Sequence, residues 1–339
     1  MTLLEPWVLF RLAAGILSML LFAYGAWVGA RILRYAHVEA ATEGRLVLER
    51  QFELAATLVR VGAAAQLSCV LLSILAADRL SGVIRGAMCG YGVVQQNVWG
   101  WTSMSLSLAS SLAAGVLLQL FALDRRVRGL DLMRPLAALT VVMAGAPLLD
   151  LVACVAWLGR LDLSATASCC STTLDSARRE GLAYWQGPRI ATTWGALFCV
   201  TSAIGAAMSA HRQPRRAPVT IAGGITLVAL PLSIAAVILE VAPHIYEVPE
   251  HLCPFCLFKA DAYFIGYPLL GAVLLAGIWG LGSSAAASLS SGPRVAEAFP
   301  DFARSRMLRQ AIAWALALVL GAAPVAVYTL GSRGASLFR

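Results

Sequence analysis

The residues of this chain whose types and spacing best suit chemistry are two cysteines in the run Cys253-Pro254-Phe255-Cys256. Three positions further along lies Lys259, the only lysine among the 26 basic residues. If a helix begins here, Cys253 is its N-cap and Pro254 takes the first helical position, where a missing N–H costs nothing, so both sulfurs lie on one face. The helix N-terminus and a nearby ammonium both favour a thiolate, so we expect a nucleophile or a metal ligand. The alternatives are a structural disulfide or two buried thiols.

The elements that position these cysteines must be membrane-spanning helices. Hydrophobic residues make up 59% of the chain and charged residues 13%, and the apolar stretches can cross about 30 Å of hydrocarbon at about 1.5 Å per residue. The sequence therefore predicts an all-α polytopic membrane helix bundle, with residues 1–339 forming a single membrane domain. Residues 45–53 are expected to extend the second span as an amphipathic helix. The eight expected spans are 7–30, 55–77, 101–123, 135–159, 190–210, 217–241, 260–282 and 308–330.

The distribution of arginine predicts how the bundle is oriented. With the N-terminus outside, the cytoplasmic connections hold 16 of the 26 basic residues and the opposite side holds nine, although residues 160–189 place four arginines outside. The net charge of +8 therefore reflects topology, and nucleic-acid binding is excluded because no basic stretch is interleaved with aromatic residues. We expect a multi-pass protein of the bacterial inner membrane that retains its first span, since Glu5 precedes Arg11 and no basic segment comes first.

This topology sorts the eight cysteines into two groups. Three lie inside spans, where a cysteine behaves as a small apolar residue: Cys69, Cys154 and Cys199. Five face outward, into the compartment that we expect to be the periplasm: Cys89, Cys169, Cys170, Cys253 and Cys256. In an oxidising compartment such a set suits thiol–disulfide exchange, permanent disulfides or capture of a soft metal ion. Five is an odd number, so one thiol is left over if all pairing is internal.

A Cys-x-x-Cys pair at the outer end of a membrane helix, followed within one turn by a basic residue, resembles the quinone-coupled disulfide oxidoreductases of the DsbB and vitamin K epoxide reductase type. The resemblance implies that Cys253 and Cys256 form the quinone-proximal pair and that Lys259 stands near the family's basic residue, one position early. It also implies a quinone cofactor and a periplasmic thiol protein or membrane-complex partner. Those families have four or five core helices, whereas this chain has eight expected spans.

The resemblance further implies a second, loop-borne cysteine pair, which in this chain is represented by Cys89 and the adjacent Cys169 and Cys170. A disulfide between adjacent cysteines is strained, and strained disulfides exchange readily. The alternative is that one of the two pairs with Cys89 and joins two loops. In the exchange mechanism, a thiolate from these three residues attacks the Cys253–Cys256 disulfide, and the remaining cysteine resolves the mixed disulfide. We expect Cys253 to be the attacking residue toward the partner and Cys256 the resolving one.

Two other classes of function remain open. The outward thiols could bind or transport a soft metal such as copper or mercury, as adjacent cysteines in mercury-transport membrane proteins suggest by resemblance, or His244, His251, Cys253 and Cys256 could hold zinc. The chain could also be a non-catalytic subunit or assembly factor whose outer loops are joined by disulfides. A haem is not expected, because no histidine lies in the middle of a span and no Cys-x-x-Cys-His occurs. Methionine pairs of a copper conduit are missing from the sequence, so we rank oxidoreductase above transport.

Several polar residues fall within or beside the expected spans. Asp150 could line a proton path, pair with an arginine such as Arg11, or be a neutral buried carboxyl. Glu240 is expected to reach water at the outer interface. The run 95–97, Gln-Gln-Asn, opens the third span and is expected to cap it rather than bind a quinone head group. Pro268 is expected to kink the span after Cys-x-x-Cys, where an open backbone could line a pocket.

Overall fold

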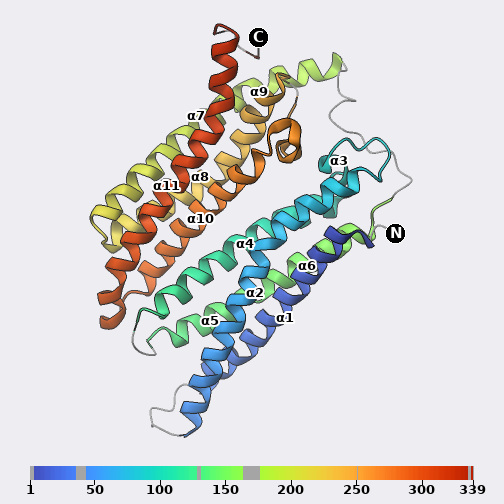
Figure 1. The fold of residues 1–339 in the computed structure, drawn as a ribbon. Helices are drawn as coiled ribbons and strands as arrows, with labels where there is room; N and C mark the ends of the chain where they lie inside the picture. Colours follow the sequence, from blue (N-terminus) through green and yellow to red (C-terminus); the bar gives the residue numbers. More distant parts are fainter. Residues whose placement is uncertain are drawn as a thin grey trace. The chain divides into compact units, whose positions relative to one another are not determined.

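A computed structural model of the chain describes residues 4–35, 43–127, 131–162, 176–249, 251–334 and 337–338, except the side chains of 43–45 and 176–186. It is 86% helical, and no strand occurs among the described residues (Figure 1). The helices are α1 (Pro6–Tyr35), α2 (Glu43–Ser81), α3 (Gly90–Val94), α4 (Val98–Asp124), α5 (Met133–Met143), α6 (Gly145–Gly159), α7 (Ser176–Arg212), α8 (Arg216–Ala236), α9 (Ala242–Tyr246), α10 (Gly266–Leu289) and α11 (Pro293–Gly331). A π-helical turn, Val237–Val241, joins α8 to α9, and two 3₁₀ turns, Pro254–Phe258 and Ala260–Ala262, precede α10.

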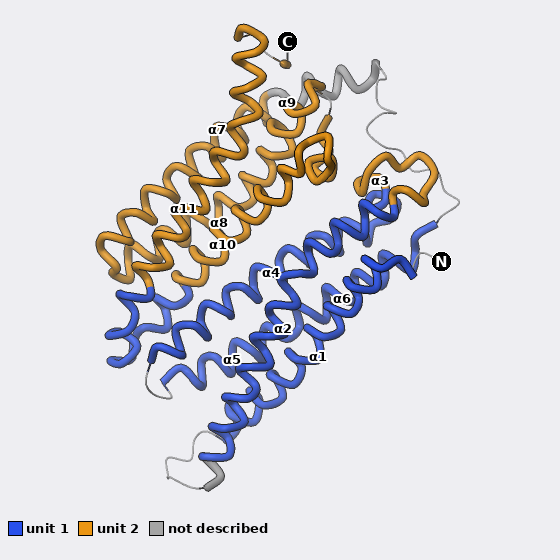
Figure 2. Tube along the Cα trace, viewed as in Figure 1, with its two compact units in different colours: residues 1–80, 93–162, 285–302 blue, residues 81–92, 163–284, 303–339 orange. Residues whose placement is uncertain are grey.

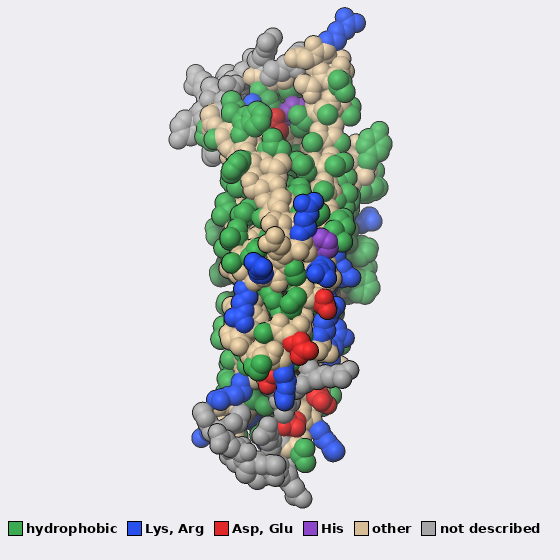
Figure 3. All heavy atoms as spheres, turned by 90° about the vertical axis from the view of Figure 1, so that its left-hand side faces the viewer, with side chains coloured by type: hydrophobic (Ala, Val, Ile, Leu, Met, Phe, Trp, Pro, Cys, Tyr) green, Lys and Arg blue, Asp and Glu red, His purple; other side chains and the backbone are tan. Residues whose placement is uncertain are grey.

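Eight helical segments of the described chain are long and apolar enough to cross a membrane, which confirms the prediction of an all-α polytopic bundle. On the face drawn in Figure 3, hydrophobic side chains are prominent in the upper part, and most of the charged side chains gather in the lower part. Exposed apolar side chains are expected where lipid replaces water as the solvent. Residues such as Phe198 and Leu227 are 72% and 61% exposed in the middle of their helices. The chain is therefore a multi-pass membrane protein.

The helix boundaries differ most from the expected spans at the starts of four helices, α2, α7, α10 and α11, and α7 begins at Ser176 rather than near 190. Helix α2 begins at Glu43, which confirms that the second span has a helical extension. Helix α11 begins at Pro293 rather than near 308, because proline is favoured at a first helical position. Helix α10 begins at Gly266 rather than at 260, because Tyr263 and Phe264 take left-handed backbone conformations with φ of 52° and 54°. A left-handed residue ends a right-handed helical turn.

The described residues divide into two compact units, which Figure 2 colours separately. The first comprises residues 1–80, 93–162 and 285–302, and the second comprises residues 81–92, 163–284 and 303–339. The two units are considered one at a time below. That the chain forms one membrane domain stays a prediction.

In the first unit, α1 packs against α5 and α6, and α4 packs against α6. Small residues allow this close packing, because apolar side chains gain little by leaving lipid and helices associate through backbone proximity. A Cβ atom added to Gly29 of α1 would lie 2.9 Å from the carbonyl oxygen of Ala137 in α5. Helix α4 contributes a buried row of serines, which includes Ser103, Ser107 and Ser110.

A buried ion pair lies at the centre of the first unit. Arg11 Nη2 of α1 donates to Asp150 Oδ1 of α6 at 2.7 Å, and both side chains are almost fully buried. Arg11 Nε also donates to Ser73 Oγ at 2.6 Å, and Gln66 Nε2 donates to Asp150 Oδ2 and to Ser110 Oγ, each at 2.7 Å. Of the three interpretations of Asp150, the structure shows the pairing with Arg11. Gln66 was not singled out from the sequence, although a glutamine inside an apolar span is a usable signal.

The polar side chains before α4 bind the backbone at the end of α6 and just after it, and do not cap α4 as expected. Asn97 occupies the N-cap position with extended backbone, but its side chain makes no capping hydrogen bond. Its Nδ2 instead donates to the carbonyl oxygens of Trp157 and Arg160, at 3.3 and 3.4 Å. Gln96 exchanges two hydrogen bonds with the backbone of Asp162. The prediction of side-chain capping is therefore wrong, because the last carbonyls of α6 lie close enough to compete for the same donors.

In the second unit, α7 packs along α8 and the π-helical turn, and the described parts of α10 and α11 complete the unit. Thr226 of α8 is the meeting point of these helices: its hydroxyl accepts from Gln310 Nε2 of α11 at 2.7 Å and from Trp314 Nε1 at 3.5 Å. A Cβ atom on Gly280 of α10 would lie 2.9 Å from both Gln310 and Thr226. Glycine is thus required for the close approach of α10 to α8.

Candidate functional site: a three-cysteine cluster

The Cys-x-x-Cys run forms a short 3₁₀ turn rather than the first turn of a membrane helix. Cys253 stands at the N-cap position with φ of −95° and ψ of 110°, and Pro254 takes the first helical position, both as expected. The Cys253 side chain makes no capping hydrogen bond, and the turn ends at Phe258 because Lys259 is extended. The expectation that this run starts the seventh span is therefore wrong: the turn is separated from α10 by the second 3₁₀ turn and its left-handed residues.

A glycine allows this turn to rest on the start of α10. A Cβ atom on Gly266 would lie 3.0 Å from the carbonyl oxygen of Leu257 and 2.9 Å from the ring of Phe258. Tyr246, the last residue of α9, donates its hydroxyl to the carbonyl oxygen of Cys256 at 2.9 Å. The turn is thus held by the segment that precedes it, through Tyr246, and by the segment that follows it, through Gly266.

Cys89 reaches the same place from the segment after α2. The chain reverses direction at Gly86, whose φ of 79° is readily adopted only by glycine, and Cys89 then lies directly before α3. Lys259 Nζ donates to the carbonyl oxygen of Met88, the residue before Cys89. The lysine therefore attaches the segment that carries Cys89 to the segment that carries the Cys-x-x-Cys pair.

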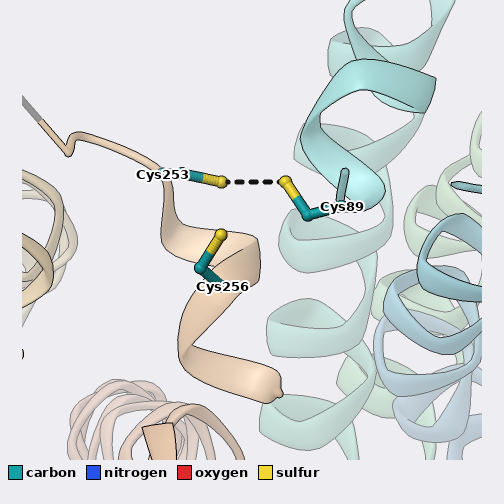
Figure 4. A group of neighbouring side chains, drawn as sticks. All are labelled: Cys89, Cys253 and Cys256. Carbon is teal, nitrogen blue, oxygen red and sulfur yellow. Dashed lines mark hydrogen bonds between the residues drawn. The ribbon is translucent and has the colours of Figure 1, made fainter. Parts of the chain in front are cut away.

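The sulfur atoms of Cys89, Cys253 and Cys256 all lie within 4.8 Å of one another. Figure 4 shows the sulfur of Cys253 facing that of Cys89, at a distance of 3.3 Å, with the sulfur of Cys256 beside them. Cys253 and Cys89 are 0% and 1% exposed, whereas Cys256 is partly exposed. Cys256 is therefore the most accessible of the three sulfurs, whereas Cys253 was expected from the sequence to be the attacking residue.

His251 lies beside this cluster and is held by an aromatic stack. Its ring lies parallel to that of Tyr246, with centroids 4.1 Å apart and an interplanar angle of 24°. Burial lowers the pKa of His251 from its usual value, and the nearby sulfur of Cys89 opposes that shift. The imidazole is therefore neutral at pH 7. Its Nε2 atom is buried and has no hydrogen-bond partner among the described residues, so it is available to a proton or a metal ion.

The other predicted site residues fall into two groups. His244 lies with different neighbours: its Nδ1 is 2.7 Å from the carbonyl oxygen of Glu240, and its ring meets those of Tyr328 and Phe338 edge-on. It is not part of the sulfur cluster. Cys169 and Cys170 lie outside the described residues. Sequence reasoning missed Tyr246, whose only signal was an aromatic residue at a helix end shortly before the cysteines.

Comparison with known proteins yields no match: no family model, no curated protein and no solved structure resembles the chain closely enough to report. The function must therefore be argued from the site itself.

Proposed function

We propose that this protein is a bacterial inner-membrane thiol–disulfide oxidoreductase whose reactive residues are Cys89, Cys253 and Cys256. The observation that carries the proposal is that the three sulfurs lie within 4.8 Å of one another, so a disulfide between any two has the third sulfur next to it. Exchange needs such an arrangement, because a thiolate must reach a bonded sulfur directly. A purely structural disulfide does not need a third cysteine.

The reaction begins at the partly exposed sulfur. A thiolate of a periplasmic dithiol partner attacks Cys256 Sγ in the Cys253–Cys256 disulfide, and Cys253 leaves as a thiolate. The second partner thiolate then attacks its own sulfur in the mixed disulfide and displaces Cys256. The partner has lost two electrons and two protons, and the cysteine pair has gained them. Regeneration passes these electrons to a membrane acceptor, for which the family resemblance suggests a quinone.

Cys89 allows a second thiol–disulfide exchange, which takes place within the cluster. Its thiolate attacks Cys253 Sγ in the Cys253–Cys256 disulfide, so that a Cys89–Cys253 bond forms and Cys256 is released as a thiolate. No electron is gained or lost in this step, which moves the disulfide from an accessible position to a buried one. His251 is suited to accept the proton of Cys89, because burial lowers its pKa and its buried Nε2 atom has no hydrogen-bond partner in the described part of the chain.

Orientation is the second part of the proposal. Cys89 follows the second span and Cys253 the sixth, and an even number of crossings between them requires the same side of the membrane, in agreement with their contact. The arginine distribution favours the periplasmic side for this face. In intact cells, a membrane-impermeant maleimide applied after mild reduction should label Cys256. Labelling only after the membrane is broken would contradict the orientation and the proposed periplasmic partner.

Trapping of a mixed disulfide tests the chemistry. In a Cys89→Ser, Cys253→Ser variant, the thiolate of Cys256 attacks the disulfide of the oxidised partner and releases one partner thiolate. No other cysteine of the cluster can then displace the partner, so a mixed disulfide should accumulate and disappear on reduction. Cys256→Ser should trap far less, because the remaining sulfurs are buried. Cys199→Ser is the matched control, since Cys199 lies in α7 away from the cluster. Equal adduct in all three variants, or none in any, would refute the exchange mechanism. Non-reducing electrophoresis with mass spectrometry provides the readout.

The same geometry favours a second candidate, a soft-metal site. Zinc–thiolate bonds of about 2.3 Å in a tetrahedral site put sulfurs about 3.8 Å apart, and the three sulfurs here lie within 4.8 Å of one another. Thiolates also prefer Cu(I) and Hg(II), which the three sulfurs alone could bind. Metal analysis and thiol counting on one chelator-free preparation separate the two functions. About one metal ion per chain with all three thiols reduced would favour the metal site and refute the oxidoreductase.

A further inference from the structure

A cavity of about 400 Å³ lies in the second unit, among α7, α8, α10 and α11. Its walls are almost entirely apolar, with Leu197, Val237, Leu269 and Val325 among the residues that line it. Small residues open the space: at Gly321, the nearest atom to an added Cβ is 3.8 Å away. The cysteine cluster contributes no residue to these walls.

One charged side chain breaks the apolar lining. Glu240 lines the cavity from the π-helical turn, a type of irregularity that is often found at functional sites. Its carboxylate forms an ion pair with Arg189 of α7 and is 3.4 Å from the hydroxyl of Thr193, which also lines the cavity. The two charged side chains are only 16% and 14% exposed.

Arg189 is not itself among the residues that line the cavity, but it pairs with Glu240 at the cavity wall and has one hydrogen-bond donor that is not used. Its guanidinium stacks 3.6 Å from the ring centroid of Phe338, and Nη1 is bound to Glu240, but the buried Nε has no acceptor among the described residues. A buried N–H without an acceptor costs free energy, which a bound oxygen would recover. Because Glu240 already balances the charge of Arg189, that oxygen should belong to an uncharged group.

We propose that this cavity binds an uncharged amphiphile with a long apolar chain and a small head group that carries a hydroxyl or carbonyl oxygen. The chain fills the apolar cavity, the head oxygen accepts a hydrogen bond from Arg189 Nε, and a head hydroxyl donates to Glu240. An anionic head would face the carboxylate of Glu240, and a cationic head would compete with Arg189 for it. Acyl glycerols and isoprenoid alcohols share this chemistry. The proposal does not depend on the proposed cysteine chemistry.

A second apolar cavity lies beside the 3₁₀ turn that carries Cys256. This smaller cavity, of about 100 Å³, is lined by Pro254, Leu257 and Phe258 of that turn, and it shares Val237 and Leu269 with the larger one. Pro268, whose expected kink was to open a pocket here, is not among its lining residues. A bound chain that extended from the larger cavity into the smaller one would therefore contact Leu257, the residue next to Cys256 in the chain.

Binding to the purified full-length protein in detergent tests the proposal, with 1-palmitoylglycerol and geranylgeraniol as the uncharged probes and palmitate as the anionic one. We expect at least tenfold tighter binding of one or both uncharged probes than of palmitate, and comparison of those two distinguishes an acyl from an isoprenoid ligand. Gly321→Leu and Ala322→Leu, which fill the cavity from the α11 side, should weaken the preferred probe at least tenfold. Leu227→Phe, on an exposed part of α8 outside the cavity, should not change binding.

A charge change gives the decisive comparison. Glu240→Gln leaves Arg189 without its counter-charge, so the preference should shift at least tenfold toward palmitate. If wild-type protein binds all three probes equally and the cavity-filling variants bind them as well as wild type does, the cavity is only a groove filled by bulk lipid and the proposal is wrong. A preference that Glu240→Gln leaves unchanged would equally overturn it. Thermal unfolding of each variant identifies any that fail to fold, in which case the remaining variants decide.

Discussion

Removing one partner of the buried Arg11–Asp150 pair should destabilise the first unit strongly. In Asp150→Asn the guanidinium of Arg11 stays buried at 0% exposure and loses the charge of Asp150, its one ion-pair partner among the described residues, while Ser73 still accepts from Nε. Breaking a buried pair on one side typically costs about 3–5 kcal/mol, which is a change of about a hundredfold to several thousandfold in the unfolding equilibrium constant. Gln66 would retain an oxygen acceptor in the asparagine, so most of the loss comes from the uncompensated charge.

The magnitude can be isolated with a double-mutant cycle. Arg11→Met and Asp150→Leu together remove both charges and keep apolar volume, so the double variant should be much closer to wild type than either single variant, with a coupling free energy of at least about 2 kcal/mol. Unfolding by sodium dodecyl sulfate in mixed micelles, followed by tryptophan fluorescence, gives the free energies. If each single variant lies within about 1 kcal/mol of wild type, or if the two effects simply add, the pair does not hold α1 to α6 as argued.

Three further predictions concern the cysteine cluster. With the protein reduced, iodoacetamide should alkylate Cys256 at least tenfold faster than Cys253, because only Cys256 is partly exposed; equal rates would contradict the assigned entry point. Lys259→Met removes the hydrogen bond to the Met88 carbonyl and the cation near the thiols, so thiol exchange with a small disulfide at pH 7 should slow several-fold. An unchanged rate would show that Lys259 has no effect on the reactivity of the thiols. Because burial lowers the pKa of His251 in the folded state, the unfolded state binds more protons as the pH falls below about 6.5, so stability should fall between pH 7 and pH 5. His251→Gln should reduce that loss, as thermal unfolding at the two pH values would show.

Most of the fold could be predicted from composition and length. A backbone in hydrocarbon must satisfy its own hydrogen bonds, so long apolar stretches can only become helices, and eight of them were found near the expected positions. The boundaries that failed are the starts of helices, where hydrogen bonding to water or to nearby side chains can replace helical pairing. The start of α10 depends on left-handed backbone at Tyr263 and Phe264, which neither residue type favours on its own.

Polar residues within the helices were only partly predictable. An aspartate in the middle of an apolar span must be paired or neutral, so a partner for Asp150 could be expected, and Arg11 was the natural candidate. The hydrogen-bond partners of Asn97 could not be predicted, because they are carbonyl oxygens at the end of α6. Backbone acceptors carry no sequence signal, since every residue has one.

By itself, the sequence determined that this is a helical membrane protein and that Cys253 and Cys256 lie close together, because both results follow from local chemistry and spacing. It also indicated which side of the membrane Cys89 would share with them. Only the tertiary structure decided that Cys89, 164 positions from Cys253, lies 3.3 Å from it, that neither His244 nor His251 completes the three-sulfur cluster as a ligand, and that Cys256 is the most accessible sulfur. The physical reason is that these outcomes depend on how separate helices pack, and packing is set by many small contacts among groups far apart in the chain.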